Sequence, residues 1–319
     1  ARTLERKYAY AFASRGAGVV EWAWNINPMM PIDNESVIGF FRPDGTAKPE
    51  LDVVPAYAAF FRAAAPLLDD FDPDPVVAVI PHSRLFMGRP AATDGFRRMI
   101  RLMAERLGVV PTALSELRLT PERLRGAKLV VVASPEFLAA SAADALLTAS
   151  RSGTKVLFIG PVTGDPYGEV PASLAALGVA DAGRPVALRE PAGGRLATFD
   201  RNLRESLLRS LAPPRASFEG NVWHEPLPLD HAREDEPLAA LLEKAFAAAG
   251  VAAHPSDTGV AARLLAAPRA VLGIFVNETA RDAQRTVTVG ARKVAVDVPA
   301  ERARMVLFDR TGAIIAQTP

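Results

Sequence analysis

Hydrophobic residues recur at helical spacing near both ends of the first seventy residues. Leu4, Tyr8 and Phe12 share one face of a helix predicted over 3–15, and a second helical pattern runs over 49–68. Between them, residues 18–24 favour β-structure and predict a short buried strand. Residues 25–48 are rich in Asn, Pro, Asp and Gly, which indicates a long loop of the kind that often carries function.

The pattern changes after a linker rich in proline and aspartate at 70–75. Short aliphatic runs then alternate with helical segments, which predicts a buried parallel sheet covered by helices. The expected strands are 76–80, 110–119, 128–133 and 155–159, with 217–229 extended, and the expected helices are 91–107, 139–152, 200–211 and 236–249.

From Ala270 onward, strand-like segments alternate with polar turns and predict a small antiparallel β-domain. Its expected strands are 271–276, 285–289, 293–298, 304–308 and 313–317. We therefore expect three parts: residues 1–70, residues 71–268 with the parallel sheet, and residues 269–319 with the antiparallel strands.

Composition narrows the function classes. The 319 residues are 49% hydrophobic, which is enough for real cores and is typical of a soluble globular protein. A net charge of +1 provides no field that would attract nucleic acid or an anionic membrane, and no apolar run is long enough to span a bilayer. The absence of cysteine excludes disulfides, thiolate metal sites and cysteine nucleophiles. The cellular compartment stays open.

The segment around the predicted aromatic strand has the composition of a carbohydrate site. Aromatic rings cover the apolar faces of sugars, while Asn, Asp and Glu bind their hydroxyls. Trp24 and Asn25 end the strand, and Asp33-Asn34-Glu35 lies in the loop that follows. The structural alternative is that the tryptophans belong to a core and the polar residues to turns. Glu21 is expected to form a structural ion pair rather than to act as a nucleophile.

Three stretches resemble a known family. Residues 8–25 (YAYAFASRGAGVVEWAWN), 33–35 (DNE) and 38–50 (IGFFRPDGTAKPE) look like the seventh helix, eighth strand and eighth loop of family-42 β-galactosidase-like glycoside hydrolases. The resemblance implies an α/β chain made of the end of a (β/α)8 barrel, a flavodoxin-like parallel-sheet domain for trimerisation and a small antiparallel β-domain. The start at Ala1 within a helical pattern then suggests a fragment or processed product.

The resemblance also implies a function. It suggests retaining hydrolysis by two carboxyl groups, both on earlier barrel strands, so we assign no catalytic residue to this chain. The implied substrate-binding residues are Trp24 as a sugar platform and Asn25, Asn34 and Glu35 as hydroxyl partners, with Glu35 the foremost polar candidate. The implied partners are the missing N-terminal portion of the barrel, a carbohydrate substrate and further copies of the chain, as a trimer.

Two alternatives from other classes stay open. One is a non-enzymatic assembly or sugar-binding module. The other is a flavin- or nucleotide-binding module, whose phosphate contacts would come from Ser83, Arg84 or Arg89 after the first sheet strand. No glycine-rich phosphate loop is present, and His82, His224, His231 and His254 are scattered without metal-ligand spacing. We therefore expect neither a cofactor nor a metal.

Overall fold

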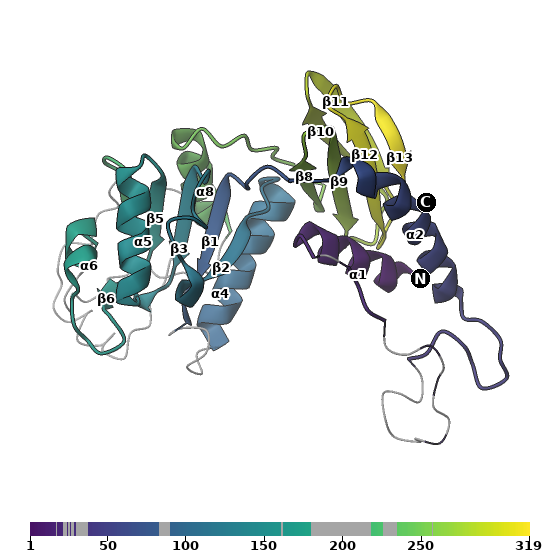
Figure 1. The fold of residues 1–319 in the computed structure, drawn as a ribbon, viewed down its shortest axis with the longest axis horizontal. Helices are drawn as coiled ribbons and strands as arrows, with labels where there is room; N and C mark the ends of the chain where they lie inside the picture. The colour runs from purple at the N-terminus through teal and green to yellow at the C-terminus, as the bar shows by residue number, and fades with distance from the viewer. Residues whose placement is uncertain are drawn as a thin grey trace. The chain divides into compact units, whose positions relative to one another are not determined.

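The computed structural model describes residues 1–16, 18–21, 24, 26, 29, 38–82, 90–160, 162–179, 218–225, 235–256 and 258–319. These residues form two compact units, drawn in Figure 1. One unit combines Ala1–Asp72 with Ser256–Pro319, and we call it the split unit. The other is the continuous stretch Pro73–Pro255, which we call the inserted unit.

The aliphatic runs of the inserted unit form a parallel sheet, as predicted. Its described strands pair in the order β2-β1-β3-β5-β7, and all neighbouring strands are parallel. Counted in chain order, this is the 2-1-3-4-5 order of flavodoxin-like sheets. The strands are β1 (Val76–Ile80), β2 (Thr112–Ser115), β3 (Leu129–Ala133), β5 (Lys155–Ile159) and β7 (Val222–Glu225). The predicted α/β class of this segment is confirmed.

Helices cover both faces of this sheet, which is why its strands are apolar on both sides. In β3, Val131 packs into one layer and Val132 into the other, and both are fully buried. The first layer contains α4 (Pro90–Arg101), the π-helical turn η4 (Leu102–Arg106) and α8 (Glu236–Ala248). The second contains α5 (Ala140–Arg151) and α6 (Ala172–Leu177). Near the carboxyl ends of the strands lie η5 (Glu116–Arg118) and a small parallel pair, β4 (Glu136–Phe137) and β6 (Val162–Gly164).

The split unit has three layers. Its central layer is an antiparallel sheet in the order β13-β12-β9-β8, and the hairpin β10-β11 packs on one face of it through a valine- and phenylalanine-rich core. The other face packs against α1 (Arg2–Ala13) and α2 (Val53–Ala64), with η2 (Pro49–Asp52) and η3 (Ala65–Leu67) at the two ends of α2. The strands are β8 (Val260–Ala266), β9 (Ala270–Asn277), β10 (Ala283–Val289), β11 (Arg292–Val298), β12 (Ala303–Asp309) and β13 (Ile314–Gln317). The predicted antiparallel β-structure is confirmed.

Two features differ from the expectations. The antiparallel sheet includes β8, so its compact unit resumes at Ser256, where the sequence pattern placed a boundary at 268. The buried strand expected at 18–24 is absent from the described residues 18–21 and 24, and Val20 is 94% exposed. A strand needs a neighbour to pair its backbone groups, and no described strand is adjacent to this segment.

Candidate functional site

Helix α1, which precedes the candidate sugar-binding segment, is held in place by contacts of Tyr8. On α1, the Tyr8 ring packs edge-on against Tyr57 of α2, with centroids 5.4 Å apart. The Tyr8 hydroxyl also donates a hydrogen bond to the Glu21 carboxylate, and burial together with this carboxylate raises the pKa of Tyr8 to about 12. Glu21 thus has a structural partner, although it is a tyrosine rather than the cation that we expected.

Trp24 is exposed, and the rings of two phenylalanines contact it. Its indole lies edge-on to Phe40 at 6.0 Å and tilted against Phe41 at 5.2 Å, yet 60% of the residue stays open to solvent. The Trp24 carbonyl accepts hydrogen bonds from the N–H groups of Phe40 (2.8 Å) and Phe41 (3.2 Å), and Ile26 N–H donates to the Phe41 carbonyl (3.3 Å). In this structure Trp24 is therefore an exposed residue in contact with two rings, and it is not part of a core.

A tight turn after Phe41 stiffens the same region. Arg42 N–H donates to the Thr46 carbonyl at 2.9 Å, and Gly45 N–H donates to the Arg42 carbonyl at 2.9 Å. Gly45 has a φ of 79°, in the left-handed region that favours glycine. The Asp44 carboxylate accepts from both the hydroxyl (2.7 Å) and the N–H (2.9 Å) of Thr46. These two bonds lower the pKa of Asp44, so Asp44 is an ionised group of the turn.

The predicted hydroxyl partners cannot be placed beside this platform. Asn25, Asn34 and Glu35 lie outside the described residues. The signal that sequence reasoning missed is the pair Phe40–Phe41, whose rings hold Trp24. An open indole face of this kind can stack on the apolar face of a pyranose.

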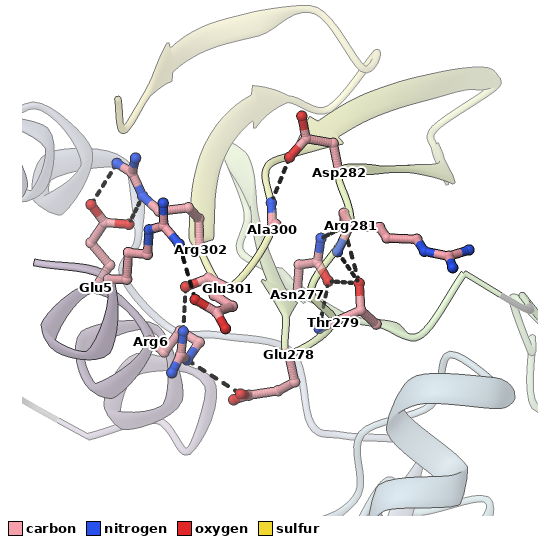
Figure 2. Close-up of polar contacts among 11 residues, drawn as sticks. Glu5, Arg6, Asn277, Glu278, Thr279, Arg281, Asp282, Ala300, Glu301 and Arg302 are labelled. Carbon is pink, nitrogen blue, oxygen red and sulfur yellow. Dashed lines mark hydrogen bonds and ion pairs between the residues drawn. The ribbon is translucent and has the colours of Figure 1, made fainter.

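A polar cluster attaches helix α1 to the loops of the β-structure (Figure 2). Glu5 is 4% exposed, and its carboxylate receives two bonds from Arg302, one of them from Nη2 to Oε1 at 2.6 Å. Glu278 accepts from the Tyr10 hydroxyl at 2.8 Å and pairs with Arg6 Nε at 3.3 Å. The helix that leads to the candidate platform is therefore fixed to the loops that follow β9 and β11.

Asn277 organises the turn beside this cluster (Figure 2). Its Nδ2 donates to the carbonyls of Arg281 (2.8 Å) and Val298 (2.9 Å), while its Oδ1 accepts from the N–H (2.9 Å) and the hydroxyl (2.7 Å) of Thr279. The side chain is fully buried. Although Asn277-Glu278-Thr279 matches the glycosylation triplet, an amide with these bonds is not accessible for modification.

Glu116, the first residue of η5, is buried at the carboxyl end of the parallel sheet. Burial raises the pKa of Glu116, against the opposing effect of hydrogen bonds from the backbone N–H groups of His82 and Ala139. His224 Nε2 is 2.9 Å from the Gly160 carbonyl. Among the described residues, no three His, Asp or Glu side chains are grouped so that they could hold a metal. Ser83, Arg84, Arg89 and His231 lie outside those residues.

Comparison by sequence finds no relative: no protein-family model and no curated protein matches the chain. In the part that the structure describes, no helix is both long and apolar enough to cross a membrane.

Comparison by structure matches the chain to several β-galactosidases. A β-galactosidase from Bacillus circulans sp. alkalophilus matches 95% of this chain over 51% of its own length, with a TM-score of 0.67 and 10% identity. A polyextremophilic β-galactosidase from the Antarctic haloarchaeon Halorubrum lacusprofundi matches 97% over 50% of its length, with a TM-score of 0.59 and 16% identity. A GH42 β-galactosidase from G. stearothermophilus matches 94% over 50%, with a TM-score of 0.60 and 10% identity.

At these identities the similarity concerns the fold, and the chain spans about half the length of each match. The architecture implied by the family resemblance, with a parallel α/β part and separate antiparallel sheets, is confirmed at that level. This chain thus has the fold of a portion of the GH42 β-galactosidases, consistent with their C-terminal part.

Proposed function

We propose that this chain is the C-terminal part of a retaining glycoside hydrolase that acts on β-galactoside-like substrates. In this proposal the split unit contributes a wall of the sugar site, and the flavodoxin-like inserted unit holds subunits together. The fold similarity to GH42 β-galactosidases over nearly the whole chain supports it.

The observation that carries the proposal is the exposed, supported ring of Trp24. The indole is propped on Phe40 and Phe41 and the residue stays 60% exposed, so its ring is available to stack on the apolar face of a sugar. The proposed hydroxyl partners of the sugar are Asn25, Asn34 and Glu35, with Glu35 the foremost polar one.

The second support is the exposed stretch 18–20. Val20 is 94% exposed, and β-branched residues such as Val19 and Val20 favour strands. We propose that residues 18–24 become the last strand of a (β/α)8 barrel when the rest of that barrel is present. The two catalytic carboxyl groups, about 5 Å apart in a retaining enzyme, would lie on those other strands.

The test compares the chain alone with a longer polypeptide that includes the barrel. We expect the chain alone not to hydrolyse chromogenic β-galactosides, and the longer polypeptide to hydrolyse them. In the longer polypeptide, Trp24→Ala is expected to lower kcat/KM about tenfold, the equivalent of about 1.4 kcal/mol of ring stacking. Trp24→Phe should retain part of that activity, and Ile314→Ala, at a 52% exposed residue of β13, should leave it unchanged.

Two outcomes would overturn the proposal. Turnover by the chain alone would mean that a catalytic pair lies within it. A barrel without two carboxyl groups at its strand ends, or one that binds sugars and never hydrolyses them, would instead favour the alternative of a non-enzymatic sugar-binding or assembly module.

A further inference from the structure

Phe40 belongs both to a buried core and to the surroundings of Trp24. It is 8% exposed and lies in the helix-side core, the apolar layer between the antiparallel sheet of the split unit and helices α1 and α2. Its ring also meets the Trp24 indole edge-on, with the centroids 6.0 Å apart. One side chain therefore connects the interior of the split unit with the exposed aromatic ring.

The backbone around Phe40 holds the same contact. Phe40 N–H donates to the Trp24 carbonyl at 2.8 Å, and the Phe40 carbonyl accepts from Lys48 N–H at 2.8 Å. Lys48 directly precedes η2, which leads into α2. Phe40 is thus bonded to Trp24 on one side and to the start of a helical segment of the split unit on the other.

A second residue of the helix-side core reaches the same segment. Tyr8 is buried against Tyr57 of α2, and its hydroxyl donates to the Glu21 carboxylate, three residues before Trp24. The core therefore contacts this segment at two points. Because close-packed interiors transmit a displacement rather than absorb it, the position of the core affects the position of both points.

Phe41 makes the other ring contact with Trp24, but its environment differs. It is only half-buried, and it pairs with Ala47 across the turn that follows it. Phe40 is the phenylalanine whose ring is buried in the core. Of the two, it provides the more direct connection from the core to the indole.

We infer that Phe40 is a positioning residue for the sugar site, through which the helix-side core sets the place of the Trp24 ring. This role rests on the proposed function, because it requires Trp24 to stack on a sugar. Leu272, Ile274 and Met305 of the antiparallel sheet line the same core, so the sheet takes part in substrate binding without touching the substrate. A ring that is held in place before binding lowers the entropy cost of binding.

Kinetics of the longer polypeptide provide the first test. Phe40→Leu should raise KM about fivefold and leave kcat unchanged, because stacking on the ring is the same in the ground state and the transition state. The matched control is Phe60→Leu in α2, since Phe60 is 5% exposed in the same core and its ring contacts Phe61. Both variants remove a ring from one core, which costs stability in each, but Phe60→Leu should leave KM unchanged.

A double variant separates positioning from a general structural effect. If Phe40 acts through the indole, Phe40→Leu should raise KM no further in a Trp24→Ala background, because the ring that it positions is already gone. A general weakening of the fold would instead raise KM by the same factor with and without the indole.

The chain alone, labelled with 5-fluorotryptophan, provides a test that needs no hydrolysis. The fluorine signal of Trp24 is identified by its absence from the spectrum of Trp24→Phe. Phe40→Leu should narrow this signal, because the indole gains motion, and should leave the signal of the buried Trp223 unchanged. Phe60→Leu should leave both signals unchanged.

Three results would each overturn the inference: equal KM in the two leucine variants, an equal rise in KM with and without the Trp24 ring, or an unchanged Trp24 line width in Phe40→Leu. An unmodified longer polypeptide that does not hydrolyse β-galactosides is instead a failure of the proposed function. The fluorine signal of Trp24 then still decides whether Phe40 holds the ring, so the two failures can be told apart.

Discussion

The pair Glu5–Arg302 offers a sharp test of how helix α1 is held (Figure 2). Replacing Arg302 with methionine removes the cation and leaves a carboxylate whose side chain is only 5% exposed. Removing one partner of a buried ion pair costs about 3–5 kcal/mol, because the remaining charge has lost its water and its partner. Arg302 itself keeps 34% exposure, so solvent screens part of the interaction and we expect the lower end, about 3 kcal/mol.

Hydrogen exchange of peptides from α1, β9 and β12 measures this loss in the split unit alone. A cost of about 3 kcal/mol should speed exchange through opening of that unit by about two orders of magnitude. The double variant Glu5→Gln/Arg302→Met should lose less than Arg302→Met, since no buried charge is left behind. The exposed pair Arg2–Glu301 is the control, and Arg2→Met should cost less than about 1 kcal/mol. If Arg302→Met and Arg2→Met speed hydrogen exchange by the same factor, the reasoning is refuted.

Three further expectations concern other sites. Because burial raises the pKa of Glu116, its contribution to stability is present in acid and is lost as the pH rises through the folded-state value. Urea unfolding at several pH values should therefore show the unmodified chain losing stability relative to Glu116→Gln as pH increases, and a constant difference would contradict this. Thr46→Val removes the hydroxyl that holds the pKa of Asp44 low, so NMR titration should find that pKa raised, and an unchanged value would exclude the bond. Gly273→Ala places a Cβ 2.8 Å from two phenylalanine rings and should cost about 1–3 kcal/mol in thermal unfolding, whereas Gly18→Ala, with nothing within 4 Å, should be neutral.

Elements with a strong local signal could be predicted from the sequence. The aliphatic run of β3 is buried on both faces and indicates a parallel strand without further information. Strand β8 was missed because Val260–Ala266 contains mostly helix-favouring Ala, Leu and Arg. Its seven residues pair with β9, and such long-range pairing overrides local preference.

The candidate site was less accessible to sequence reasoning. Alternating side chains around Val20 predicted a strand, but no local pattern can supply the neighbour that a strand needs. The support of Trp24 depends on Phe40 and Phe41, which lie sixteen and seventeen positions further along the chain. The attachment of α1 joins residues nearly three hundred positions apart, such as Glu5 and Arg302, and charged residues at that separation carry no pairing signal in one sequence.

The interruption of the split unit has a consequence for biosynthesis. Pro73–Pro255 is continuous, so it can acquire its structure as soon as it leaves the ribosome. The split unit, whose two segments flank it in the sequence, must wait for Ser256–Pro319, because β8, β9 and β12 supply the sheet against which α1 and α2 pack. During that interval the apolar faces of both helices are uncovered, and the nascent chain is then most dependent on chaperones.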